Sequence, residues 1–189
     1  MTSIWYETVE GEQAYKALLA ERFSRKQFDR HLSLAVIGSG CTTICDMLCC
    51  PFERPPNRGE TIGMHQRVAL FPLNGTESAR VVLFDTGEWS LSRYKHLVGH
   101  ISEAAATLLV LPLGHPSLTS HSRLVEAMGN LPGTLPTKPV VVIVTTTNDA
   151  PVTAGGLAEV MRDTPYVVAG PYGPRTAATV LWKALSLGK

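Results

Sequence analysis

No stretch of this sequence is apolar for the ~18–20 residues that a membrane-spanning helix needs. The longest apolar run, Ala104 to Leu113, is about half that length. Neither sign of charge dominates, because 17 Lys and Arg residues stand against 16 Asp and Glu residues. A near-neutral chain gives no electrostatic reason to expect nucleic-acid or anionic-membrane binding. What remains is one globular domain of 189 residues, which is long enough to bury a core.

Targeting signals are also missing from the sequence. Residues 1–4 carry no basic segment or cleavage site of the secretory type. Thr2 stands where myristoylation needs glycine, and residues 186–189 contain no cysteine for a prenyl group. We therefore expect a cytoplasmic protein with no lipid anchor of its own.

Cysteine is scarce and confined to one place: Cys41, Cys45, Cys49 and Cys50. The spacing of four places three of them on one face of a helix. No histidine follows at zinc-finger spacing, and there is no second cysteine pair. We interpret the thiols as reduced and packed as small apolar side chains; a metal or redox site is the alternative.

The first thirty residues are predicted to form a helical extension, residues 1–30, ahead of the main domain, residues 31–189. Thr8 can cap a helix whose first turn carries Glu10 and Glu12, near its positive end. Apolar side chains then follow at helical spacing: Tyr15, Leu18, Leu19 and Phe23. The basic stretch 22–30 is either a solvated helix end or a site for an anion or a partner.

The main domain alternates between predicted strands and helices. The expected strands are 32–37, 65–72, 79–84, 107–113, 140–145 and 166–169, and the expected helices are 42–50, about 89–106, one marked by Leu118 to Met128, 151–162 and one marked by Ala177 to Leu185. Asn74-Gly75 is a hairpin signal that pairs the second and third strands antiparallel. Alternation elsewhere predicts an α/β fold with a six-stranded, mostly parallel sheet covered on both faces.

A glycine-rich turn follows the first strand of this sheet. A phosphate cradle needs such a turn before a helix N-terminus, so that backbone N–H groups converge on the anion. The turn is Gly38-Ser39-Gly40-Cys41-Thr42-Thr43, in which Thr43 can stand for the magnesium-binding hydroxyl of a P-loop. It is two residues shorter than a P-loop and lacks its lysine. A plain strand-to-helix turn is the alternative, and a dinucleotide-binding turn fails at its third glycine.

Two further segments have the order of GTPase switch motifs. Asp85 and Gly87 follow the third strand, where GTPases hold magnesium through an aspartate and sense the γ-phosphate through a glycine N–H. The spacing is one residue shorter than Asp-x-x-Gly, and an acidic turn is the alternative. Glu88 stands at the position of the glutamine that orients water, so it is the single catalytic candidate, and its charge disfavours hydrolysis. Thr61, before the second strand, is the expected threonine that closes over magnesium, which makes Thr43, Thr61 and Asp85 the candidate metal ligands.

The last two strands end in residues that could contact a guanine base. Thr147 and Asp149 follow the fifth strand, where Asn-Lys-x-Asp is the specificity signature, and Asp149 keeps the aspartate. Asp149 could equally cap the next helix. Ala169 ends the sixth strand and offers a backbone N–H. These candidates all fall at the carboxyl edge of the sheet, where open α/β sheets bind ligands.

A partner surface is predicted over 51–64 and 88–94, because this loop region is rich in aromatic and arginine residues. Phe52, Trp89 and Tyr94 are its aromatic members. Such residue types dominate interface hot spots. The alternative for Trp89 is that its ring folds back onto the sheet and supports the core.

Several segments together resemble one family. They are Trp5 to Glu12, then Glu60-Thr61-x-Gly63, Val68-x-x-Phe71-Pro72, Arg80-Val81-Val82-x-Phe84 and Asp85-x-Gly87-Glu88. This pattern resembles the Rem- and Rab-like small GTPases of the ciliogenesis and planar-polarity effector (CPLANE) complex, in the Ras superfamily. The resemblance implies a Ras-like P-loop NTPase fold, GTP or GDP with Mg²⁺ as ligands, and Fuzzy- and Inturned-like partners. It also implies a place at the ciliary base or basal body.

The sequence departs from that family at the P-loop lysine and at the lysine of the fifth-strand motif, both of which are missing, and Ras-like enzymes in general have glutamine where Glu88 stands. The leading hypothesis is therefore a small-GTPase-like subunit in cilium assembly with weak or absent GTP binding and hydrolysis, a pseudo-GTPase. A conventional GTP-binding switch in ciliogenesis or vesicle trafficking is the alternative. An unrelated α/β nucleotide-binding enzyme is the remote one, since the sequence has no Ser-His-Asp or Cys-His arrangement at recognisable spacing.

Overall fold

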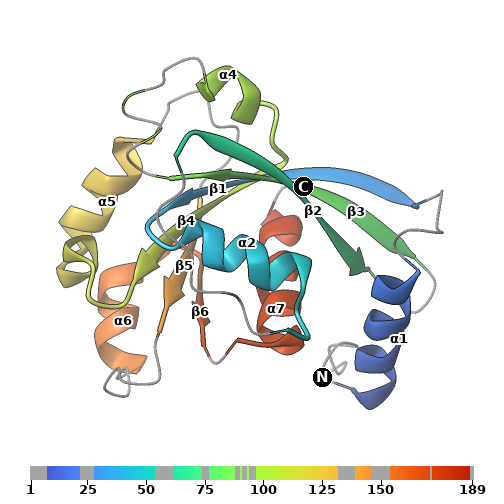
Figure 1. Ribbon diagram of the computed structural model, residues 1–189. Coiled ribbons are helices and arrows are strands. Elements are labelled where there is room, and N and C mark those ends of the chain that lie inside the picture. Colours follow the sequence, from blue (N-terminus) through green and yellow to red (C-terminus); the bar gives the residue numbers. More distant parts are fainter. Residues whose placement is uncertain are drawn as a thin grey trace.

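The computed structural model describes residues 8–21, 28–53, 62–73, 77–87, 90, 93, 97–131, 139–145, 154–170 and 172–187. Its strands are β1 (Arg30–Gly38), β2 (Met64–Pro72), β3 (Ser78–Thr86), β4 (Ala106–Pro112), β5 (Val140–Val144) and β6 (Tyr166–Ala169) (Figure 1). Its helices are α1 (Val9–Ala20), α2 (Cys41–Cys49), α4 (Leu97–Ile101), α5 (His121–Gly129), α6 (Ala154–Met161) and α7 (Pro174–Leu187), with a 3₁₀ turn η2 (Pro116–Thr119).

The six strands form one sheet in the order β2-β3-β1-β4-β5-β6. β2 and β3 pair antiparallel, and every other neighbouring pair is parallel. The predicted six-stranded, mostly parallel sheet with one antiparallel pair is therefore confirmed. The Asn74-Gly75 signal that predicted the pairing lies outside the described residues. β1 is central, since it pairs with β3 on one side and with β4 on the other.

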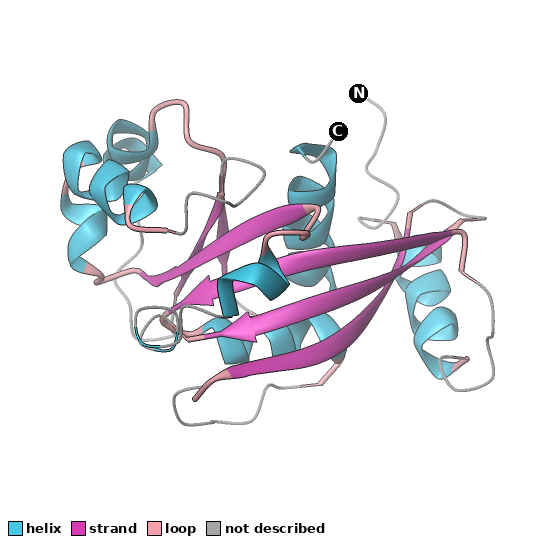
Figure 2. Ribbon diagram, turned by 90° about the horizontal axis from the view of Figure 1, so that it is seen from above, coloured by secondary structure: helices cyan, strands magenta, loops and turns pink. Residues whose placement is uncertain are grey.

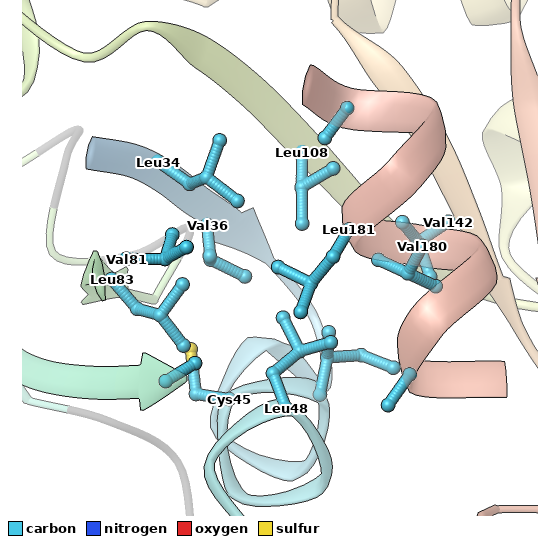
Figure 3. Packing of buried hydrophobic residues seen from close by; sticks show 14 of the residues in the cluster. Leu34, Val36, Cys45, Leu48, Val81, Leu83, Leu108, Val142, Val180 and Leu181 are labelled. Carbon is cyan, nitrogen blue, oxygen red and sulfur yellow. The ribbon is translucent and has the colours of Figure 1, made fainter. Parts of the chain in front are cut away.

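Helices cover the sheet on both faces, which gives three layers (Figures 1 and 2). The strands β4 and β5 are continuous apolar runs because both of their faces are buried. On one face, α2 and α7 pack against the sheet through a cluster that includes Leu48, Leu83 and Leu181 (Figure 3). On the other face, α5 and α6 pack against β4 and β5 through a second cluster, which includes Leu124 and Ile143.

Helix α1 begins as the sequence predicts. The Thr8 side chain accepts a hydrogen bond from the backbone N–H of Gly11 at 3.0 Å, which caps the helix. Tyr15 and Leu18 are buried, and the helix packs against β2. The helix ends at Ala20, and residues 22–27 lie outside the described part of the chain.

Two predicted helices are shorter in the structure. The segment from Leu118 to Met128 divides into η2 and α5, because Ser120 is extended and its hydroxyl caps α5 by accepting from Arg123 N at 3.4 Å. Of the predicted segment 89–106, the structure describes Ser90 and Arg93, which are helical, and residues 97–106, in which α4 ends at Ile101 and the chain turns before β4 begins at Ala106. Within the described residues, no helix is long and apolar enough to span a membrane.

Candidate functional site

The glycine turn joins β1 to α2 at the carboxyl edge of the sheet. Gly38 has φ +115° and Gly40 has φ +90°, backbone angles that residues with a side chain rarely adopt. A Cβ on Gly38 would lie 2.3 Å from the carbonyl oxygen of Val110 on β4, so close packing by itself requires glycine there. Ser39 and Gly40 are exposed, so their backbone faces solvent above the sheet. This geometry suits a plain strand-to-helix turn as well as an anion cradle.

The first turn of α2 places Thr42 rather than Thr43 beside Asp85. Thr42 is 8% exposed and its hydroxyl donates to Asp85 Oδ1 at 3.3 Å. Thr43, the predicted metal-binding hydroxyl, is half-buried on another side of the helix. Adjacent residues on a helix point about 100° apart, so only one of the two can face the end of β3. The structure therefore brings Thr42 to the predicted aspartate.

A single arginine links Asp85 to α2. Arg67 Nε donates to Asp85 Oδ2 at 3.1 Å, and Arg67 Nη1 donates to Asp46 Oδ1 at 2.5 Å. Register explains the first contact, since Arg67 pairs with Leu83 on β3, two residues before Asp85, and alternate strand residues share a face. Asp46 follows Thr42 by one helical turn, so both point at the same region of the sheet.

The Arg67 guanidinium stays positively charged at this position. Burial alone would lower the pKa of Arg67, and the carboxylates of Asp46 and Asp85 outweigh that effect and raise the pKa. Asp85 is fully buried, and the side chain of Arg67 is 19% exposed. A charged pair so removed from water gains strength from the low dielectric and needs its partners to remain in place. The three residues, Arg67, Asp85 and Asp46, are called the Arg67 bridge below.

These residues do not fit the Mg²⁺ ion that a GTPase carries. Mg²⁺ needs oxygens at ~2.0–2.1 Å in near-octahedral geometry. Both oxygens of Asp85 accept from protein donors, and one donor is itself a cation, which repels a second cation at the same carboxylate. Among the described residues, no group of three or more His, Cys, Asp or Glu side chains could hold a metal. Thr61, the third predicted ligand, lies outside the described residues.

The cysteines pack along α2 as the sequence analysis expects. Cys41 and Cys45 are buried, Cys49 and Cys50 are partly buried, and all four are free thiols. Burial, with the nearby Asp85 charge, raises the pKa of Cys41 to about 12. Burial, with the neighbouring Cys50, raises that of Cys49 to about 12. The thiols of Cys41 and Cys49 are therefore protonated near neutral pH, and the thiolate form that metal binding or redox chemistry requires is suppressed in them.

The two predicted switch segments meet at their described ends. Gly63 N donates to the Ser90 hydroxyl at 2.8 Å, and Ser90 N donates to Gly87 O at 3.0 Å. Gly87 is buried, and its carbonyl oxygen takes part in this junction. Glu88, Trp89 and Tyr94 lie outside the described residues, and their predicted roles stay predictions.

Phe52, the remaining predicted partner-binding residue, is half-buried and packs against α1. Its ring lies edge-on to Tyr15 of α1, with centroids 5.7 Å apart. The ammonium group of Lys16 lies 5.0 Å from the centroid of the same ring. Helix α1 therefore contacts much of the surface that Phe52 would offer to a partner. A role in partner binding stays a prediction for this residue.

The predicted base-binding edge is described only in part. Ala169 is fully buried at the end of β6, where its carbonyl accepts from Thr145 N at 3.2 Å. A Cβ on Gly170 would lie 2.0 Å from the Thr145 hydroxyl oxygen, so the ends of β5 and β6 are tightly packed here. Thr147 and Asp149 lie outside the described residues, so their predicted contact with a guanine base stays a prediction.

Besides a hollow of about 360 Å³ whose lining includes Lys16, Cys49 and Phe52, two larger hollows open elsewhere on the described surface. One of about 750 Å³ lies between α5 and α6, beside His121 and Leu157, and contains none of the predicted site residues. A second, of about 530 Å³, lies beside α4 and α5 and includes Gly38 in its lining. It opens on the face of the sheet opposite α2, away from the Arg67 bridge.

No protein-family model matches the chain, and no curated protein matches it. The functional interpretation therefore depends on the residues and the geometry described above.

Proposed function

We propose that this protein is a small-GTPase-like subunit or regulator in cilium assembly that binds and hydrolyses GTP weakly or not at all. The observation that carries the proposal is the Arg67 bridge at Asp85. In this bridge, the Asp85 carboxylate, which corresponds to the magnesium-binding group of a GTPase, is paired with the guanidinium of Arg67. The scaffold is then maintained by packing, and its function lies in binding partners.

The architecture supports the Ras-like part of the proposal. The strand order β2-β3-β1-β4-β5-β6, with β2 alone antiparallel, is compatible with a Ras-like fold. The glycine turn lies between β1 and α2, and Asp85 lies at the end of β3, which is the order of the P-loop and the second switch.

The chemistry of the turn supports weak nucleotide binding. The turn has no lysine, so the β- and γ-phosphates lose their main positive partner. The hydroxyl nearest Asp85 belongs to Thr42 and is already hydrogen-bonded to that carboxylate. A phosphate brought to this turn would therefore meet backbone N–H groups and hydroxyl groups such as that of Ser39, and no cationic side chain of the turn.

The cellular part of the proposal depends on the family resemblance. The segments Trp5 to Glu12 and Asp85 to Glu88 carry it, together with the shortened switch spacing. We propose Fuzzy- and Inturned-like subunits as partners, and the cytoplasm at the ciliary base as the location.

Nucleotide content tests the proposal directly. The purified chain is denatured, the released nucleotide is quantified by chromatography, and a fluorescent GTP analogue is titrated in magnesium and in EDTA. We expect no stoichiometric nucleotide and far weaker binding than a Ras protein shows. Guanine nucleotide recovered at near one-to-one stoichiometry would contradict the proposal.

A conventional GTP switch is the second candidate, and one observation favours it. Gly38 and Gly40 both have positive φ at the start of α2, and Ser39 and Gly40 are exposed. Successive backbone N–H groups in such turns form anion-binding concavities. The titration separates the two candidates, since a switch requires tight, magnesium-dependent binding.

Partner binding is tested through Trp89. Trp89→Ala is expected to cost less than about 1 kcal/mol of stability, as for a surface change, and to abolish pull-down of a Fuzzy- or Inturned-like subunit. A loss of several kcal/mol, or normal pull-down, would instead favour the core interpretation of Trp89.

A further inference from the structure

The Arg67 bridge joins three elements that a bound magnesium ion would otherwise influence. Arg67 lies on β2, Asp85 on β3 and Asp46 on α2. The contacts of Arg67 with Asp85 and Asp46 use different guanidinium nitrogens, so one side chain spans two carboxylates from different elements. A planar guanidinium with several fixed donors suits this double contact, whereas a lysine ammonium is a single charged point.

We propose that Arg67 is the resident counter-ion of Asp85, a protein cation in the role that a divalent metal has in a GTPase, so that β2 is fixed to α2 without any ligand. The inference rests on the proposed function only where it equates Asp85 with the magnesium-binding aspartate. The contacts themselves are independent of that equation.

Burial is the reason that a counter-ion is required. Asp85 has no exposed surface and the side chain of Asp46 is 10% exposed, so water screens neither charge well. Removing one partner of a buried ion pair leaves an uncompensated charge, which is more damaging than losing the whole pair. Arg67 thus supplies permanently what a metal would supply only when bound.

The permanent charge of Arg67 has a consequence for the position of β2. In a switch protein, ligand and metal bias the positions of the loops around β2 and β3. Here the ion pairs from Arg67 to Asp85 and Asp46 are made by side chains of the chain itself. We therefore infer that the described part of β2 holds the same position with or without divalent cations.

A manganese titration of the wild-type full chain is the first test. Free Mn²⁺ is followed by electron paramagnetic resonance in nucleotide-free buffer. We expect no binding tighter than millimolar. One Mn²⁺ bound per chain, and lost in Asp85→Asn, would overturn the inference. This arm requires no Arg67 variant to fold.

Thermal melts of variants form the second test. Arg67→Met should melt below wild type, and the double variant Arg67→Met/Asp85→Asn should recover part of the loss. Mg²⁺ or Mn²⁺ should raise the melting temperature of Arg67→Met and leave wild type unchanged, because a ligand that binds only the folded state stabilises it. The melting temperature of Arg67→Lys should fall between those of wild type and Arg67→Met. Arg175→Met is the matched control, since Arg175 is exposed on α7, and it should melt as wild type does.

The outcomes separate this inference from the proposed function. Arg67→Met melting as Arg175→Met does would overturn the counter-ion role. GTP that binds tightly in EDTA, with no manganese site in the wild type, would contradict the proposed function and support the counter-ion role. A wild-type manganese site at Asp85 would overturn the counter-ion role, and the GTP titration would then decide the proposed function independently.

Discussion

The ring of Tyr15 on α1 lies edge-on to the ring of Phe71 on β2, with centroids 6.0 Å apart and planes at 79°. Edge-to-face aromatic pairs at this separation add attraction beyond the area they bury. Both side chains are almost fully buried, so α1 shares one core with the sheet. The helical extension predicted from the sequence is thus packed into the main domain rather than beside it.

Substitution of Tyr15 should separate the contribution of its ring from that of its hydroxyl. Tyr15→Ala is expected to cost about 3–5 kcal/mol, as for other large core truncations. The Tyr15 hydroxyl is buried and has no hydrogen-bond partner among the described residues. Tyr15→Phe should therefore be neutral or stabilising. Urea unfolding followed by circular dichroism measures both, and an equal loss in the two variants would mean that the hydroxyl has a partner.

Gly38→Ala should destabilise the domain strongly. The new Cβ would meet the Val110 carbonyl at 2.3 Å and the residue would keep φ near +115°, so clash and backbone strain together should cost about 3 kcal/mol or more. Gly129→Ala is the matched control, because nothing lies within 4 Å of its Cβ position at the end of α5. The control should be neutral or gain up to about 1 kcal/mol. Thermal melts compare the two, and a mild Gly38→Ala would show that β1 and β4 can separate at this point.

The two threonines of the turn should respond differently to the same substitution. Thr42→Val removes the hydroxyl that donates to Asp85 Oδ1 and should cost about 1–3 kcal/mol. Thr43→Val, on a half-buried position of the same helix, should change stability by less than about 0.5 kcal/mol. Denaturant midpoints of both variants decide the matter. A larger loss from Thr43→Val would return the hydroxyl role to Thr43, as the sequence pattern predicts.

Stability should fall at alkaline pH through the buried thiols. The pKa of Cys49 is raised to about 12 in the folded chain, chiefly by burial. The unfolded thiol titrates near its ordinary value of about 8.5–9, so stability from the protonated thiol is complete below that value and is lost as pH rises toward 12. By pH 10 the loss should reach about 1 kcal/mol for Cys49. Melts of wild type and Cys49→Ala at pH 7 and pH 10 measure it, and identical pH slopes would contradict it.

The fold was largely predictable because it follows from local patterns. The β-branched run Val140 to Val144 predicts a strand buried on both faces, and the structure places β5 there. Thr8 predicts a helix start through a bond that spans only three residues. The split between η2 and α5 was not predicted, because Ser120 is capable of either helical or capping geometry and the spacing of Leu118 and Leu124 suits a single helix.

The central feature of the site was not predictable from the sequence. Arg67 lies in an ordinary strand pattern and belongs to no motif, and its partners Asp46 and Asp85 are distant in the sequence. A register along β2 is needed before Arg67 and Asp85 share a face, and that register is a property of the assembled sheet. The sequence pattern assigns the magnesium-binding hydroxyl to Thr43 rather than Thr42, because a shortened turn has no unique alignment to the P-loop.

The central position of β1 imposes an order on how the sheet can be assembled during synthesis. Residues 30–37 of β1 pair with β3 on one edge, and residues 34–38 pair with residues 106–110 of β4 on the other. A nascent chain that has left the ribosome only as far as β3 can close the first edge but not the second. The edge left open is that of residues 34–38, the most apolar part of β1. An unpaired apolar strand edge can pair with other chains and cause aggregation. A fragment ending before Ala106 should therefore aggregate, and the first half of the molecule depends on its second half for solubility.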